Sequence, residues 1–139
     1  MNPTKCRLID LRKISDNRGS LTPIECGRDI PFEIKRIYYL YDVPASLQRG
    51  AHAHRALHQF FIPIGGSFDM NVDDGKTKHT YHLDRVDCGL YMPPMIWHDL
   101  SNFSTAAVCL ALTSDYYNES DYLRTYPEFG AALEGALKS

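Results

Sequence analysis

The feature that most constrains the fold is a series of short apolar stretches, each ended by turn-forming residues. Between residues 68 and 72, Phe68, Met70 and Val72 alternate with polar residues, which predicts a strand with one buried face. The next residues, 73–76, predict a hairpin turn in which the glycine adopts a positive φ. Further strands are expected at residues 6–11, 20–25, 34–41, 51–64, 78–83, 89–92, 97–103 and 106–113. Short strands at near-regular spacing favour a β-sandwich or barrel over alternating strands and helices.

Only at the end of the chain does the spacing of the apolar residues change. Beyond Pro127, the apolar residues Phe129, Leu133 and Leu137 recur at every fourth position. This spacing predicts a short amphipathic helix that packs on the barrel or on a second subunit. Because no internal repeat, linker or low-complexity tract interrupts the 139 residues, we expect a single domain spanning residues 1–139.

The overall charge and the cysteines exclude several classes of protein. A net charge of −2 gives no general attraction to nucleic acid or to an anionic membrane. No apolar run reaches the roughly 20 residues of a membrane span, and residues 1–12 do not resemble a signal peptide. The four cysteines include no CxxC pair, which favours free thiols over structural zinc. We therefore expect a cytoplasmic protein that binds neither nucleic acid nor membranes.

Two histidines separated by one residue carry the most chemistry. In a strand, His52 and His54 project from the same face. An imidazole with a pKa near 6.5 accepts and returns protons near neutrality, which is what proton abstraction beside a carbonyl requires. Tyr38 and Tyr39 could supply a phenol to the same chemistry. They point to opposite faces of one strand, and alternation alone does not say which of them faces inward.

The histidine pair is part of a pattern that resembles the two cupin motifs. The first resembling set is Gly50, His52, His54, Gln59 and Gly65, and the second is Gly89, Pro93, His98 and Asn102. The resemblance implies an all-β, cupin-type double-stranded β-helix, that is, a jelly-roll barrel, with the short helix at its C-terminus. Gln59 stands where metal-binding cupins usually carry glutamate, and its neutral amide is a weaker donor to a cation. We therefore expect no metal. A metal-dependent, dioxygenase-like enzyme using His52, His54 and His98 is the alternative.

A more specific resemblance runs through nearly the whole chain. Five blocks resemble the sugar 3,4-ketoisomerases of the WxcM-like branch of the cupins, namely residues 16–21, 34–39, 49–54, 89–98 and 114–122. The resemblance implies an isomerase that moves the keto group of dTDP-4-keto-6-deoxyglucose, a dTDP-4-keto-6-deoxyhexose, from C4 to C3 through an enediol(ate). It implies no metal or redox cofactor, and a homodimer with exchanged N-terminal strands. The product would feed the synthesis of 3-amino-3,6-dideoxy sugars for bacterial surface glycans such as O-antigen.

The resemblance also implies roles for individual residues. His54 would take the C3 proton, His52 would transfer protons at the oxygens, and Tyr38 or Tyr39 would assist. One guanidinium group can donate two parallel hydrogen bonds to the oxygens of a phosphate. The predicted diphosphate contacts are Arg18, Arg49 and Arg36. The remaining substrate-binding predictions are Gln59, Tyr91, Trp97 and His98.

Two further functions use the same residues. A non-catalytic sugar-nucleotide-binding module would bind the substrate without turning it over. A 3,5-epimerase would exchange the protons at C3 and C5, whereas a ketoisomerase would leave C5 untouched.

Overall fold

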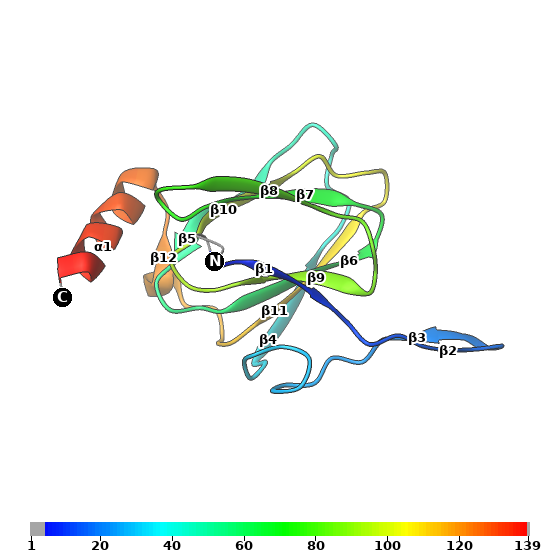
Figure 1. Cartoon of the computed structure of the whole chain (residues 1–139). Helices are drawn as coiled ribbons and strands as arrows, with labels where there is room; N and C mark the ends of the chain where they lie inside the picture. Colours follow the sequence, from blue (N-terminus) through cyan, green and yellow to red (C-terminus); the bar gives the residue numbers. More distant parts are fainter. Residues whose placement is uncertain (1–4, 139) are drawn as a thin grey trace.

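Two five-stranded antiparallel β-sheets face each other and form the barrel (Figure 1). The structure is a computed structural model that describes residues 5–138, with the side chains of residues 49, 50 and 138 outside the description. The first sheet has the order β1-β9-β6-β11-β4 and the second the order β12-β5-β10-β7-β8. Non-sequential neighbours in both sheets reflect the crossing connections of a jelly roll. The predicted all-β jelly-roll barrel with a short C-terminal helix is therefore confirmed.

Most element bounds follow the predicted stretches, but the strand predicted at residues 51–64 is two strands, separated by residues 55–58. The first sheet contains β1 (Arg7–Asp10), β9 (Cys88–Met92), β6 (Gln59–Gly65), β11 (Val108–Thr113) and β4 (Arg36–Leu40). The second contains β12 (Tyr122–Leu123), β5 (Arg49–His54), β10 (Trp97–Ser101), β7 (Phe68–Asp73) and β8 (Lys78–Leu83). A separate hairpin joins β2 (Ile14–Asp16) to β3 (Gly19–Leu21), and η1 (Glu119–Asp121) and α1 (Tyr126–Lys138) complete the described elements.

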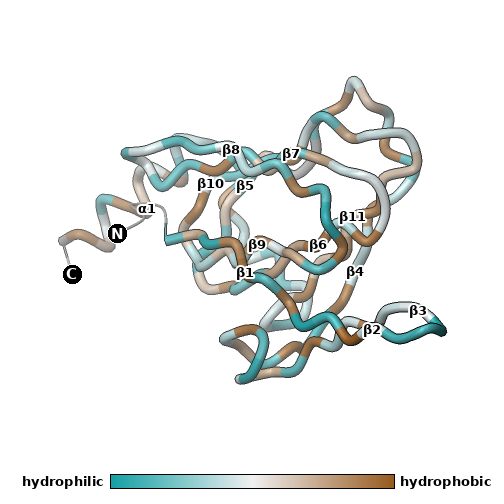
Figure 2. The backbone as a smooth tube through the Cα atoms, turned by 45° about the vertical axis from the view of Figure 1, so that its right-hand side comes forward, coloured by the Kyte–Doolittle hydropathy of each residue, from teal (hydrophilic) through white to brown (hydrophobic). Residues whose placement is uncertain are grey.

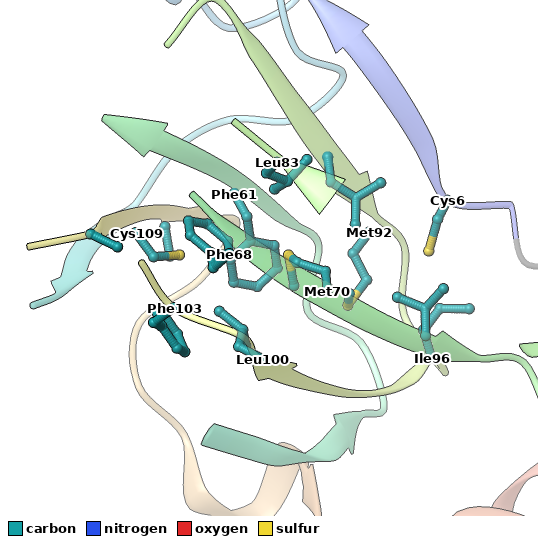
Figure 3. Packing of buried hydrophobic residues seen from close by; sticks show 14 residues of the cluster. Cys6, Phe61, Phe68, Met70, Leu83, Met92, Ile96, Leu100, Phe103 and Cys109 are labelled. Carbon is teal, nitrogen blue, oxygen red and sulfur yellow. The ribbon is translucent and has the colours of Figure 1, made fainter. Parts of the chain in front are cut away.

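Inward-facing side chains from both sheets fill the barrel (Figure 3). Phe61, Phe68 and Leu100 come from three different strands and are almost completely buried. Along β7, every second residue is apolar and buried, as the alternation predicts. Figure 2 shows hydrophobic and hydrophilic segments alternating along several strands around this interior.

The first sheet is also covered on its outer face. Ile30 and Phe32, from the connection between β3 and β4, pack there with Phe60, Ile62 and Leu112. Both faces of this sheet are therefore apolar. Because neither face is polar, the sequence alone does not indicate which side chains point into the barrel.

Helix α1 begins at Tyr126, three residues before Phe129, because Thr125 and Glu128 form a capping box at its N-terminus. The Thr125 amide donates to Glu128 Oε1 at 3.1 Å, and the Glu128 amide donates to Thr125 Oγ1 at 3.3 Å. Phe129 is fully buried and packs with Ala53 of β5 and Leu123 of β12. The helix thus lies on the outer face of the second sheet. Of the two predicted positions, on the barrel or on a second subunit, the structure shows the first.

The hairpin of β2 and β3 projects from the barrel (Figure 1) and pairs only with itself among the described strands. The strand predicted at residues 20–25 ends at Leu21. Pro23, two residues further on, has no amide hydrogen and so cannot donate a hydrogen bond to a neighbouring strand.

Candidate active site

A cluster of three imidazoles lies at the inner face of the second sheet. His52 and His54 project inward from β5, whereas Ala53 between them faces α1. His98 on the neighbouring strand β10 is in register with His52. The His52 ring centroid lies 4.7 Å from that of His98 and 4.8 Å from that of His54. The structure thus brings together the three histidines that the sequence analysis selected.

The two histidines of β5 are joined by a direct hydrogen bond. The Nε2 atoms of His52 and His54 are 3.1 Å apart, so one ring donates and the other accepts. His54 Nδ1 lies 3.2 Å from Asp121 Oδ2. His98 Nδ1 donates to the carbonyl oxygen of Ile96 at 3.1 Å, which leaves its Nε2 without that proton.

Burial keeps these imidazoles neutral. It lowers the pKa of His52 to about 2, helped by like charge on His98, His54 and Arg124. It lowers the pKa of His98 to about 4, although the hydrogen bond to Ile96 acts in the opposite direction. The pKa of His54 is also lowered by burial, and Asp121 opposes that shift. Near pH 7, all three rings are therefore proton acceptors.

These pKa shifts predict a loss of stability in weak acid. An unfolded histidine titrates near pH 6.5, so below that pH the unfolded chain binds protons that folded His52 and His98 do not. The free energy of unfolding should then fall by up to about 1.4 kcal/mol per pH unit for each such histidine. Urea unfolding at pH 7, 6 and 5 measures this slope. A free energy of unfolding that stays constant over this window would contradict the buried, neutral state of the cluster.

A cavity of about 510 Å³ opens beside the cluster. His52 and His98 line it together with Tyr38 and Arg36 of β4. A smaller recess of about 150 Å³ is lined by His54 and Asp121, and it shares Arg36 with the larger cavity. The larger volume falls within the range of ligand pockets, about 300–1,000 Å³.

The structure distinguishes the two tyrosines of β4. Tyr38 lines the cavity, and the Arg36 guanidinium lies 4.9 Å from its ring centroid. Tyr39 is 59% exposed on the opposite face and packs against Tyr41. Of the two tyrosines that the sequence left open, Tyr38 is therefore the one beside the histidines, and strand alternation directs the phenol of Tyr39 away from them.

Two other predicted aromatic contacts also lie outside the site. Tyr91 is on the outer face of the first sheet, where its hydroxyl lies 2.7 Å from His58 Nδ1. Trp97 is on the outer face of the second sheet, and its ring packs against Tyr126 and Phe129. Neither lines the cavity beside the histidines. Both substrate-binding predictions are corrected, since each indole or phenol points away from the barrel interior.

The other predicted residues differ in their placement. Gln59 is buried in β6 and pairs in register with Met92 and Thr113, but it does not line either cavity at the histidines. Arg18 lies in the turn between β2 and β3, in the hairpin that projects from the barrel (Figure 1), and its side chain is 86% exposed and 2.6 Å from Asp16. The Arg49 side chain lies outside the described part of the structure.

Three site residues follow η1 or end it, and sequence reasoning did not select them. Asp121 contacts His54, and the Tyr122 ring centroid lies 4.4 Å from that of His54. Arg124 stacks over the Tyr122 ring at 3.9 Å and donates two hydrogen bonds to Glu119. The signal available for Asp121 and Tyr122 was their position inside the last family-like block, residues 114–122, and Arg124 lies just beyond it. Only the pairing of β12 with β5 brings this segment to the histidines.

Among residues 5–138, no group of three or more His, Cys, Asp or Glu side chains forms a metal-binding arrangement. No helix in this part of the chain has the length and apolar character needed to cross a membrane.

A jelly-roll barrel with inward-facing imidazoles beside a cavity defines a cupin-type enzyme. The family model described as "FdtA: WxcM-like, C-terminal" matches residues 4–134. The TDP-4-oxo-6-deoxy-alpha-D-glucose-3,4-oxoisomerase of Aneurinibacillus thermoaerophilus is 43% identical over 123 residues, which are 88% of each chain. The chain belongs to this WxcM-like family, as the resemblance in its sequence implies.

Solved structures of the same family superimpose closely. A 3,4-ketoisomerase from Helicobacter canadensis is 40% identical, with a TM-score of 0.91 over 94% of this chain and 98% of that one. A histidine-to-asparagine mutant of the 3,4-ketoisomerase QdtA from Thermoanaerobacterium thermosaccharolyticum, in complex with TDP-4-keto-6-deoxyglucose, is 34% identical, with a TM-score of 0.93 over all of both chains.

Proposed function

We propose that this protein moves the carbonyl group of a TDP-4-keto-6-deoxyhexose from C4 to C3. The observation that carries the proposal is the row of neutral imidazoles beside Tyr38 at the cavity. The family relatives support the substrate class, because they are named as 3,4-ketoisomerases or a 3,4-oxoisomerase and one is bound to TDP-4-keto-6-deoxyglucose.

The reaction needs two coupled proton transfers and no net oxidation. A base removes the C3 proton, the electron pair forms a C3–C4 double bond, and O4 receives a proton. C4 of the resulting enediol is then protonated while O3 loses its proton, which leaves the carbonyl at C3. Proton donors and acceptors within hydrogen-bond reach of adjacent carbons and oxygens are sufficient for each step.

The contacts of the two histidines of β5 support different roles for them. His54 is proposed as the base at C3, because the Asp121 carboxylate stabilises the positive charge that a base acquires. His52 is proposed to exchange protons with O3 and O4. Its pKa of about 2 and its two imidazole neighbours make it a poor holder of a proton but a competent neutral hydrogen-bond partner. Tyr38 is proposed to assist at the oxygens from the facing strand.

Arg36 is the proposed contact for the substrate diphosphate. Its guanidinium lies over the Tyr38 and Tyr117 rings, lines both cavities, and forms no ion pair with any carboxylate of the described residues. Replacing Arg36 with alanine should raise KM by about 10-fold or more, because a hydrogen bond to a charged group contributes about 1.5–3 kcal/mol. Steady-state kinetics with the TDP-sugar measures the effect.

The matched control is Arg85→Ala. Arg85 pairs with Asp10 and Asp87 and lines neither cavity. The KM of Arg85→Ala should equal that of the unmodified protein. An equal change in KM for both variants would count against a diphosphate site at Arg36.

A homodimer with exchanged N-terminal strands is the proposed assembly. The projecting hairpin exposes Ile14 and Leu21, at 57% and 58%, and β1 already pairs with β9 of its own chain. The hairpin of β2 and β3 is therefore the N-terminal segment that we propose packs on a second copy of the chain. Arg18, in the turn of this hairpin, would then contact that second copy. Light scattering should give twice the 15.8 kDa chain mass, and a monomer at micromolar concentration would contradict this assembly.

The proposed location is the cytoplasm, where thiols remain reduced. Cys26, Cys88 and Cys109 are free thiols in the structure, which supports this location. A 3-keto sugar nucleotide is the form that an aminotransferase could convert to a 3-amino sugar. This is the reaction class that we propose consumes the product in the synthesis of bacterial surface glycans.

Incubation with TDP-4-keto-6-deoxyglucose in the presence of a chelator, followed by ¹³C NMR, tests the function. The 3-keto product should form at the same rate with and without chelator. Tight binding without product would indicate a sugar-nucleotide-binding module. Stoichiometric iron or manganese, with activity lost to the chelator, would indicate the metal-dependent alternative.

A further inference from the structure

Two backbone amides of the segment that follows β5 hold Asp121 in place. Asp121 Oδ1 accepts a hydrogen bond from the Ala56 amide at 2.8 Å, and its carbonyl oxygen accepts one from the Arg55 amide at 2.9 Å. The next residue, Tyr122, pairs with His54 across β12 and β5. The second carboxylate oxygen, Oδ2, is thereby directed at His54 Nδ1, 3.2 Å away.

We propose that Asp121 is a positioning residue that fixes the tautomer of His54 and so keeps Nε2 of this ring unprotonated, as a base requires. The proposal rests on the proposed ketoisomerase function. An ionised carboxylate only accepts hydrogen bonds, so His54 Nδ1 must carry the proton and Nε2 must be unprotonated. In the hydrogen bond between the two Nε2 atoms, His52 is then the donor and His54 the acceptor.

The hydrogen bonds therefore run in one direction, from His52 through His54 to Asp121. The lone pair of His54 Nε2 accepts the hydrogen bond from His52, so His54 takes the C3 proton once His52 donates to a substrate oxygen instead. When that proton is taken up, the positive charge on His54 lies against the Asp121 carboxylate, which is only 15% exposed. A carboxylate on the distal nitrogen of a histidine fixes ring orientation and raises basicity in this way in many sites.

The surroundings of His54 make this carboxylate the main favourable charge on the ring. His52 of β5 and His98 of β10 contact it as neutral rings, and Tyr122 packs against its face. Arg36 of β4 and Arg124 after β12 both act to lower its pKa, as does burial, and Asp121 opposes them. Without the carboxylate, His54 would be a weaker base.

The variant Asp121→Asn separates this role from a purely structural one. The Ala56 amide requires an oxygen acceptor, so the asparagine should keep its carbonyl oxygen there and turn its amide group toward His54. The amide donates to Nδ1, which forces the proton of His54 onto Nε2. The loop contact is kept while the tautomer is reversed. We expect kcat to fall by about 10²–10⁴-fold, as for other bases deprived of their preferred tautomer.

The pH dependence and the NMR spectrum of the full-length protein provide readouts that a structural role would not move. In Asp121→Asn, the acidic limb of the kcat/KM profile should move to lower pH, because a weaker base is protonated at lower pH. Long-range ¹H–¹⁵N spectra should show His54 protonated at Nδ1 in the unmodified protein and at Nε2 in the variant. The measurement on the unmodified protein needs neither a folded variant nor a substrate.

Asp69 provides a matched control, since it forms the same kind of pair on the outside of the barrel. Asp69 Oδ1 lies 2.6 Å from His82 Nδ1, and its other oxygen accepts from Asn102. Asp69→Asn should leave kcat and the pH profile unchanged.

Two results would overturn the proposal, namely an unmodified His54 protonated at Nε2 or full turnover by Asp121→Asn. An unmodified protein that carries the expected tautomer but does not isomerise the TDP-sugar would instead refute the proposed function.

Discussion

Replacing His54 with asparagine is expected to lower kcat by about 10²–10⁴-fold, the usual contribution of a positioned general base. Asparagine cannot take up the C3 proton, and it cannot use the Asp121 carboxylate to stabilise a positive charge. Because Arg36 and Tyr38 still line the cavity, binding of the substrate should change little. Single-turnover kinetics measures the first effect, and titration calorimetry with TDP measures the second.

The matched control for this prediction is His79→Asn. His79 is an exposed histidine of β8 that packs against Tyr81 and does not line the cavity beside the imidazoles. It should retain full activity. If His54→Asn also turns over at the rate of the unmodified protein, then another group takes the proton, and the role proposed for His54 is wrong.

Replacing Phe68 with alanine is expected to lower the free energy of unfolding by about 3–5 kcal/mol. Phe68 is completely buried and stacks on Phe103, with 5.4 Å between the ring centroids (Figure 3). Removing its ring takes away apolar contacts between the two sheets and leaves a cavity that close-packed neighbours fill only in part. Urea unfolding measures the change.

An exposed apolar residue provides the comparison for Phe68. Val86 is 58% exposed between β8 and β9, and Val86→Ala should change the free energy of unfolding by no more than about 0.5 kcal/mol. A loss of less than about 1 kcal/mol for Phe68→Ala would mean that the interior described here is not the main apolar core.

Strand alternation predicted the parts of the site that lie on a single strand. It placed His52 and His54 on one face of β5, and the structure confirms that they point inward together. It also separated Tyr38 from Tyr39 without deciding which faces inward. That choice depends on the sheet packed against β4, which is a property of the whole barrel.

The errors arise where both faces of a sheet are covered. Leu90 and Met92 fill the interior, so Tyr91 must face outward, yet the outer face is also apolar and buries it. Trp97 is likewise partly covered on the outer face of its sheet, by α1. With no polar face, the pattern of hydrophobic residues does not distinguish inside from outside.

Asp121 lay beyond sequence reasoning for a different reason. It is 67 residues from His54 along the chain, and the contact exists only because β12 pairs with β5. The conformation of a turn depends on neighbouring residues, such as Asp73 and Gly75 at the end of β7, and could therefore be predicted. A carboxylate that meets a histidine across two strands depends on the register of the sheet.

The position of solvent hydrogen in the product tests the central claim most directly, namely that neighbouring neutral imidazoles exchange protons at adjacent sugar carbons. The measurement is ¹H NMR of TDP-4-keto-6-deoxyglucose incubated with the protein in D₂O. We predict a 3-keto product that carries deuterium at C4 and retains its C5 proton. Recovery of the 4-keto sugar with deuterium at C5, or without any exchange, would contradict the account.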